Sequence, residues 1–196
     1  MKYLLGALVG YLLGSFPTGV VISRRKYGLD VREVGSGNIG ATNVKRIFGW
    51  YAGLLTFLID LTKALLALGA MRLFYPDSPW VLTVTGIFSV LGHCFSFVLG
   101  FKGGKGVATG LGCILFVEPL CAFISGSVYL IFLGISKISA VGSLTGLIAC
   151  LVYLIWVCPP SSVSVLIGAL CLIILTRHKE NILRLKESWK QRSKTR

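Results

Sequence analysis

Two glycine-rich, basic stretches hold the residue types that could do chemistry in this chain. The first covers 35–46 and reads GSGNIGATNVKR, and the second covers 100–106 and reads GFKGGKG. Glycine lets backbone N–H groups approach a ligand closely, and successive N–H groups in such turns form anion-binding nests. Lysine and arginine supply the counter-charge. Both stretches therefore indicate binding of phosphate groups.

Each stretch leads into an expected helix, beginning at Ala41 and at Val107. The positive end of a helix dipole would add to the attraction for an anion. Arg46 can hold a phosphate with two parallel hydrogen bonds, while Lys102 and Lys105 act as point charges. The pattern therefore predicts two phosphate cradles.

Residues 35–40 also match the pattern G-x-G-x-x-G of dinucleotide-binding proteins. That motif requires a preceding strand and an acidic residue about 20 positions further on, within a βαβ unit. Here an apolar run follows instead. In the second stretch Lys105 is followed by Gly106 rather than by serine or threonine, so the P-loop pattern is also absent.

The chain as a whole is too apolar for an ordinary soluble domain. Of its 196 residues 55% are hydrophobic, the mean hydropathy is +0.81, and only 7 are acidic. We therefore expect one polytopic membrane domain over 1–196. The net charge of +13 gathers in short connections and in a basic tail over 177–196. That is the distribution of cytoplasmic loops facing anionic membrane lipids, so no nucleic-acid partner is expected.

Apolar runs predict the helices that position these loops. Five runs have about the 20 residues that cross a bilayer: 3–22, 50–74, 80–100, 139–157 and 160–176. The run over 107–135 is longer, and Pro119 favours a break within it. Splitting it there gives seven helices and keeps the tail on the side of both glycine-rich stretches. We expect an all-α integral membrane bundle of about seven helices, or alternatively five with 107–135 re-entrant, with the N-terminus outside and the C-terminus cytoplasmic.

Two further features sit inside apolar runs. Asp60 and Lys63 are three residues apart, share a helix face and can pair. Intramembrane ionisable residues are functional candidates, but mutual compensation favours a structural pair. The six cysteines include no CxxC pair and are mostly within apolar runs, so we expect fillers rather than disulfides or metal ligands.

Four spaced motifs resemble the bacterial acyl-phosphate-dependent glycerol-3-phosphate acyltransferase family. They are 35–43 with Arg46, the pair Gly92-His93, the segment 100–109, and the tail segment 178–185. Gly14-Ser15, Asp60 and Lys63 also fit, so the resemblance extends over essentially the whole chain. The serine pair before the sixth expected span keeps Ser143 but has Ala140 in the first position.

The resemblance implies an inner-membrane enzyme with its active site facing the cytoplasm. Such an enzyme transfers a fatty acyl group from acyl phosphate to the 1-hydroxyl of glycerol 3-phosphate, and it gives lysophosphatidate and inorganic phosphate in phospholipid synthesis. The resemblance implies no metal or other cofactor. We expect catalytic roles for Ser36, Arg46, Lys105, His178 and Asn181. We expect substrate binding by Gly37, Asn38, Gly40, Thr42, Asn43, His93, Lys102, Gly103, Gly104, Gly106 and Ser143.

For this reaction the protein must align two anions and stabilise the oxyanion, because acyl phosphate already carries a good leaving group. Asp30 and Glu33 are candidate general bases, and a substrate phosphate oxygen is an alternative proton acceptor. His178 could act as an acid or base, or could orient Asn181. A small anion transporter and a lipid-binding scaffold are competing classes. No internal repeat is visible, however, and both loops are expected on one membrane side, which disfavours a transporter.

Overall fold

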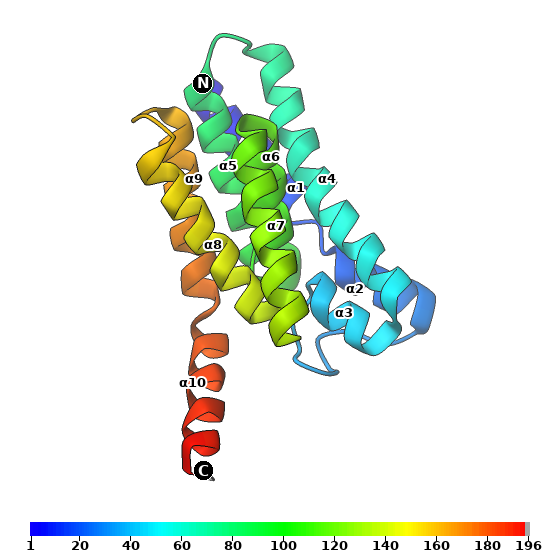
Figure 1. The fold of residues 1–196 in the computed structure, drawn as a ribbon. Helices are drawn as coiled ribbons and strands as arrows, with labels where there is room; N and C mark the ends of the chain where they lie inside the picture. Colours follow the sequence, from blue (N-terminus) through cyan, green and yellow to red (C-terminus); the bar gives the residue numbers. More distant parts are fainter. Residues whose placement is uncertain (195–196) are drawn as a thin grey trace.

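The computed structural model describes residues 1–194, and all regular secondary structure in that range is helical (Figure 1). In chain order the elements are α1 (Lys2–Gly14), α2 (Thr18–Tyr27), α3 (Ala41–Phe48), α4 (Trp50–Phe74), α5 (Pro79–Cys94), η1 (Phe97–Leu99), α6 (Val107–Val117), α7 (Pro119–Ser136), α8 (Ser139–Trp156), α9 (Ser162–Arg177) and α10 (Lys179–Lys194). The expected all-α class is confirmed.

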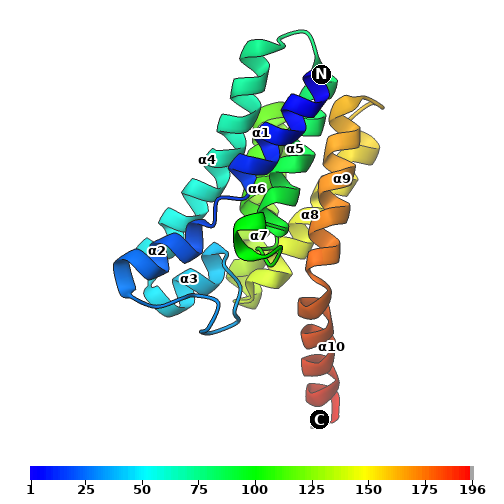
Figure 2. The same cartoon turned by 180° about the vertical axis from the view of Figure 1, so that it is seen from behind.

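The two ends of the bundle differ. The N-terminus and the connections 75–78 and 157–161 lie at one end, whereas α2 and α3 lie across the other end and α10 projects beyond it (Figures 1 and 2). Both glycine-rich stretches belong to that second end, as the charge pattern predicts. The membrane side that this end faces stays a prediction.

Five segments are long and apolar enough to cross a membrane: Lys2–Tyr27, Trp50–Phe74, Pro79–Leu99, Pro119–Ser136 and Ser139–Trp156. A sixth results if α9 is counted with the first part of α10, from which it is bent by 52°. The predicted break is confirmed, since α6 ends at Val117 and α7 begins at Pro119. Together these segments form an integral membrane bundle.

The seventh expected crossing, α6, is an apolar helix of only 11 residues. At 1.5 Å per residue it covers about half of the ~30 Å hydrocarbon layer. Lipid cannot satisfy the backbone groups at its ends. α6 instead packs against α4, α5, α7 and α9. The surrounding protein thus takes the place of lipid around this short helix.

The first apolar run is not the single helix over 3–22 that the sequence predicts. α1 ends at Gly14 and α2 begins at Thr18. Pro17 explains the break, because proline has no N–H and restricts the residue before it. At the break the carbonyl of Phe16 accepts two hydrogen bonds, from the N–H of Thr18 at 3.0 Å and from Lys63 Nζ at 3.1 Å.

The α5 helix likewise ends earlier than the apolar run over 80–100. It stops at Cys94, and η1 then leads the chain into the second glycine-rich stretch. Ser96 fixes this turn, because its buried hydroxyl donates a hydrogen bond of 2.6 Å to the carbonyl of Ser15. The ends of α1 and α5 are thereby held together at the end of the bundle that carries both glycine-rich stretches.

A stripe of glycines sets the distance between α1 and α5. Gly6, Gly10 and Gly14 are spaced by four residues and face α5, and all three are buried. A Cβ on Gly10 would overlap the carbonyl oxygen of Thr85, and one on Gly14 would overlap that of Ser89. Small residues at this spacing let two membrane helices approach closely. The stripe therefore fixes where α1 ends relative to α5.

Gly10→Ala should lower the free energy of unfolding by about 1–3 kcal/mol, because the added methyl group must push two helices apart. Thermal unfolding of the purified protein in detergent measures this. Gly134→Ala is the matched control, since a Cβ there meets nothing within 4 Å. It should leave the protein as stable as before or slightly more so. Equal losses in both variants would contradict a packing role for the stripe.

Candidate active site

A cavity of about 1690 Å³ opens at the end of the bundle that holds both glycine-rich stretches. A single small ligand typically occupies about 300–1,000 Å³, so this space is large enough for two substrates. Fifteen of the sixteen predicted site residues line it, from α3, α5, α8, the start of α10, the two glycine-rich loops and the junction of α9 and α10. Gly104 is the exception.

The lining is strongly cationic at the loop end. Nine lysines and arginines contribute to it: Arg32, Lys45, Arg46, Lys102, Lys105, Lys137, Arg177, Lys179 and Arg184. Three acidic residues do so as well: Glu33, Asp60 and Glu180. Arg46 forms no ion pair within residues 1–194 and is free to meet an anion. The excess of positive charge matches the predicted binding of phosphate.

Asn43 holds the first glycine-rich stretch in shape. Its buried side-chain amide donates to the carbonyls of Val31 at 3.2 Å and Val34 at 3.1 Å, and its Oδ1 accepts from the N–H of Ser36 at 2.9 Å. Gly35 adopts a φ of 63°, a left-handed conformation that suits glycine. Because both amide hydrogens are engaged, Asn43 positions Ser36, and a substrate-binding role for it stays a prediction.

The start of α3 is fixed by two side chains. Asn38 Oδ1 accepts a hydrogen bond of 2.8 Å from the N–H of Gly40, the residue before the helix. The Thr42 hydroxyl lies 3.0 Å from that of Ser139 at the start of α8, and Tyr129 OH lies 3.1 Å from Ser139. The first cradle is thus tied to the α7–α8 pair on the opposite wall of the cavity.

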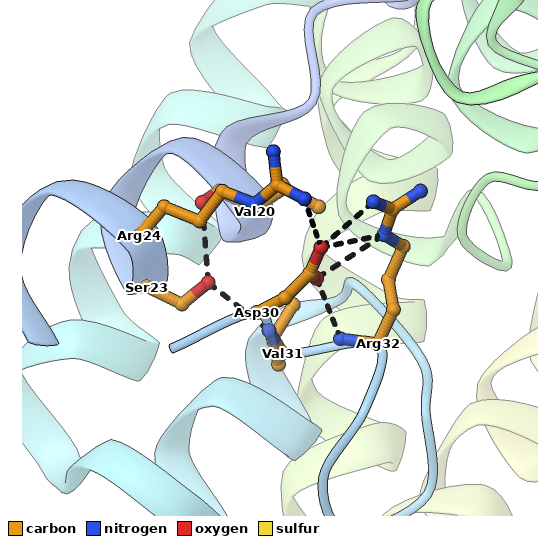
Figure 3. Close-up of polar contacts among 6 residues, drawn as sticks. All are labelled: Val20, Ser23, Arg24, Asp30, Val31 and Arg32. Atoms are coloured by element: carbon orange, nitrogen blue, oxygen red, sulfur yellow. Dashed lines mark hydrogen bonds and ion pairs between the residues drawn. The ribbon is translucent and has the colours of Figure 1, made fainter. Parts of the chain in front are cut away.

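A pair of arginines clamps the segment that precedes the first glycine-rich stretch (Figure 3). Arg24 Nη2 and Arg32 Nη2 each lie 2.7 Å from Asp30 Oδ2, and the N–H of Arg32 donates to Asp30 Oδ1 at 2.9 Å. These contacts with Arg32, supported by Arg24, hold the pKa of Asp30 well below its usual range. Asp30 is not among the cavity-lining residues, so it does not serve as the general base. Of the two carboxylates considered, Glu33 alone lines the cavity.

The second stretch is fixed by its backbone. The N–H of Gly103 donates to Cys94 O and that of Gly104 to His93 O, each at 3.0 Å. A Cβ on Gly104 would overlap the His93 ring, which explains the glycine there. The end of α5 therefore takes both of these N–H groups. Substrate binding by Gly103 and Gly104 stays a prediction, which other atoms of these residues would have to serve. Lys105 and Gly106 come next, and within residues 1–194 their N–H groups have no partner.

Arg177, which we did not predict, holds the other side of this loop. Its Nε donates to Gly104 O at 3.1 Å and its Nη2 to Gly103 O at 3.2 Å, while the guanidinium lies 5.0 Å from the Phe95 ring centre. It precedes the predicted His178 directly. In the sequence, Arg177 is one of several basic residues in the tail over 177–196. Nothing in that pattern distinguishes it from the other lysines and arginines of the tail.

Three of the predicted catalytic residues meet at the junction of α9 and α10. Lys105 Nζ donates to Asn181 Oδ1 at 2.6 Å, and burial lowers the pKa of Lys105. His178 Nδ1 lies 2.8 Å from Ile174 O. Since a carbonyl can only accept, Nδ1 carries the proton, which leaves Nε2 of the neutral ring as an acceptor. His178 is buried and lines the cavity.

The expected Asp60–Lys63 pair is confirmed. Lys63 Nζ lies 2.8 Å from Asp60 Oδ1 and 3.0 Å from His93 Nδ1, and Thr18 Oγ1 donates to Asp60 at 2.8 Å. The pair thus orients the His93 ring on which Gly104 rests. Ser143 also lines the cavity, and its hydroxyl donates to the carbonyl of Ser139 at 3.0 Å. Substrate binding by the predicted residues stays a prediction.

Comparison with known proteins places this geometry in a family. A family model described as glycerol-3-phosphate acyltransferase matches residues 4–188. The glycerol-3-phosphate acyltransferase of Aquifex aeolicus is 45% identical over 192 residues, covering 94% of this chain and 96% of that protein. The enzyme of that name from Thermus thermophilus is 39% identical over 185 residues, covering 94% and 92%.

Two solved structures share the fold. The crystal structure of PlsY, an integral membrane glycerol 3-phosphate acyltransferase, in its glycerol 3-phosphate form superposes with a TM-score of 0.88 at 39% identity, covering 96% of this chain and 94% of that one. Its lysophosphatidic acid form gives 0.85 at 37% identity, covering 96% and 93%.

Fold and site together define an all-helical integral membrane protein with a cation-lined cavity at one end of its bundle. Such a cavity suits a substrate that is anionic at one end and apolar at the other. The chain belongs to the glycerol-3-phosphate acyltransferase family. The resemblance seen in the sequence motifs is confirmed.

Asp30→Asn should destabilise the protein by about 1–2 kcal/mol at pH 7, because it removes the charge that two partly exposed arginines bind. A carboxyl whose pKa is lower in the folded state stabilises above its unfolded pKa of about 3.9, and this contribution fades as the pH falls further. The difference in the free energy of unfolding between wild type and Asp30→Asn should therefore become smaller below about pH 4. Thermal unfolding across that range is the measurement. Asp77→Asn, at an exposed carboxylate, is the control. An equal loss of stability in Asp77→Asn and Asp30→Asn would rule out a stabilising role for the contacts of Asp30 with the two arginines.

Proposed function

We propose that this protein transfers a fatty acyl group from acyl phosphate to the 1-hydroxyl of glycerol 3-phosphate, giving lysophosphatidate and inorganic phosphate. The observation that carries the proposal is the single cavity in which the ends of both glycine-rich stretches meet His178 and Asn181. Relatives named glycerol-3-phosphate acyltransferase and the glycerol 3-phosphate and lysophosphatidic acid forms of PlsY support the acceptor and the product.

The two substrates fit the two halves of the cavity. Cations and free N–H groups gather where the loops meet α3, α6 and α10, and each phosphate takes one of the two cradles. Further along, the walls become apolar through Leu111 and Ile114 of α6, Phe123 and Leu130 of α7, and Leu147 of α8. A fatty acyl chain would lie there with its phosphate at the cationic end. The amphipathic lining thus favours an acyl donor with a charged head.

In the proposed reaction the hydroxyl oxygen of glycerol 3-phosphate bonds to the acyl carbon, and the bond from that carbon to the phosphate oxygen breaks. Inorganic phosphate leaves with the electron pair and takes the hydroxyl proton. His178 Nε2 accepts a hydrogen bond from the hydroxyl and orients it for attack. Ser36, Arg46 and Lys105 bind the phosphates and offset the repulsion between two anions, while Asn181 holds Lys105 in place.

The protein acts in this proposal at the cytoplasmic face of the bacterial inner membrane, where the positive-inside rule puts the basic end of the bundle. Lys137, Lys179 and Arg184 line the same cavity as the glycine-rich stretches, and α10 projects from that end of the bundle (Figure 1). Both substrates would then reach the cavity without crossing the bilayer.

The decisive experiment incubates purified protein in detergent with palmitoyl phosphate and labelled glycerol 3-phosphate. Labelled lysophosphatidate should form without a sealed membrane, which a transporter or a lipid-binding scaffold would not produce. Palmitoyl-CoA in place of palmitoyl phosphate should give none, because its acyl carbon is bonded to sulfur and no phosphate lies next to that carbon for the proposed cradles to hold. Absence of product from palmitoyl phosphate would contradict the proposal. Equal rates from palmitoyl-CoA would contradict the assignment of acyl phosphate as the donor.

Ser36→Ala and Arg46→Gln should each lower kcat/KM by about 100-fold or more, since each removes a fixed donor at a phosphate or at the developing oxyanion. Lys186→Gln is the control for the loss of one positive charge. It lies on exposed α10, does not line the cavity and should retain wild-type rates. The proteins should accumulate to equal levels in membranes. Near-wild-type rates in the first two variants would remove both residues from the site.

A further inference from the structure

A second, smaller cavity of about 330 Å³ lies beside α2. Its walls are of two kinds. Apolar side chains come from the α1–α2 break, α2 and η1, and three arginines come from the end of α2 and the loop after it. The lining residues are Pro17, Val20, Val21, Arg24, Arg25, Arg32, Val98 and Leu99. We call this cavity the arginine groove.

The arginine groove is not neutralised by the protein. Arg24 and Arg32 share a single carboxylate, that of Asp30 (Figure 3). Arg25 has no acidic partner within residues 1–194. Asp30 binds two of the three guanidinium groups, and the Glu33 carboxylate acts on Arg32 from further away. Three positive charges thus meet two negative ones, and Arg25 is left to bind an anion. Accessible guanidinium groups next to an apolar wall suit a ligand that is anionic at one end and apolar at the other.

The groove lies where two membrane-spanning segments end. α2 is the last part of the span Lys2–Tyr27, and η1 is the last part of the span Pro79–Leu99. Val98 beside it is 54% exposed and Phe97 is 50% exposed. Apolar side chains so exposed at the end of a span contact lipid, and basic pockets between such spans bind acidic headgroups.

We propose that the arginine groove binds an anionic phospholipid of the surrounding bilayer. The lipid phosphate would lie among Arg24, Arg25 and Arg32, which can hold phosphate oxygens with parallel hydrogen bonds. The first methylenes of one acyl chain would lie along Val21 and Val98. This site is separate from the proposed phosphate cradles, although Arg32 lines both cavities.

The bound lipid would reinforce the segment that leads into the first glycine-rich stretch. Asp30 and Arg32 flank Val31, whose N–H donates to Ser23 Oγ at 3.2 Å and whose carbonyl accepts from Asn43. A phosphate on Arg24 and Arg32 would connect this segment to the end of α2 by a second bridge besides Asp30. Binding should therefore appear as a gain in thermal stability.

The test measures thermal unfolding of the purified protein in a neutral detergent with added dioctanoyl phosphatidylglycerol, dioctanoyl phosphatidylcholine or inorganic phosphate. Phosphatidylglycerol should raise the melting temperature in a saturable manner, and phosphatidylcholine should not. Arg25→Gln should remove most of this rise. Lys186→Gln, which changes the net charge equally, should keep it.

Two further arms separate the lipid from a free anion and from misfolding. Inorganic phosphate can bind in the large cavity, so any shift it causes should be the same in wild type and Arg25→Gln. Val98→Trp fills the groove without altering charge and should also weaken the response to phosphatidylglycerol. An equal response to phosphatidylglycerol in Arg25→Gln and Lys186→Gln would overturn the site. A phosphate shift as large as the lipid shift, and lost in Arg25→Gln, would mean that the groove takes a free anion and not a lipid.

Discussion

A buried ammonium group connects the helices on which the candidate active site rests. Lys63 lies within the bundle, and a charge there is tolerated only when it is paired and hydrogen-bonded. It meets Asp60 of its own helix, His93 at the end of α5 and the carbonyl of Phe16 in the break between α1 and α2. One side chain thus joins the middle of α4 to the end of α5 and to the break between α1 and α2. The His93 ring held in this way is the surface against which Gly104 lies.

The two glycine-rich stretches are shaped by different means. The first is organised by side chains, through the Asn43 amide and the carboxylate of Asp30. The second is organised by its backbone, which is held between the carbonyls at the end of α5 and the guanidinium of Arg177. In both cases the hydrogen bonds that hold the loop leave other groups available for a ligand, among them Arg46 and the N–H groups of Lys105 and Gly106. This division lets the cations and free N–H groups face the cavity in a fixed geometry, which is what electrostatic catalysis needs.

Breaks in the helices supply backbone groups that the candidate site uses. Irregular backbone is tolerated at membrane depth only where protein or a cavity satisfies it. The break at Pro17 gives a carbonyl to Lys63, and the early end of α5 gives two carbonyls to the loop glycines. The short α6 begins directly after Gly106 and points its N-terminus at the cavity side of that loop. At these interruptions the carbonyls that lack a helical partner thus accept hydrogen bonds from other parts of the site.

The sequence by itself determined the features that depend on neighbours along the chain. These are the membrane class, the break at Pro119, the helix starts at Ala41 and Val107, and the Asp60–Lys63 pair, since composition, proline chemistry and helix periodicity are local properties. The motifs also identified the family and fifteen residues of one cavity. Only the tertiary structure decided which groups hold the loops and which are left for a ligand. Arg177 reaches a glycine 73 positions away, and Asp30 became a clamp rather than a base because folding put two arginines on it. Such assignments require knowing which distant atoms meet, because one donor or acceptor can serve only the partners that the fold brings within hydrogen-bond distance.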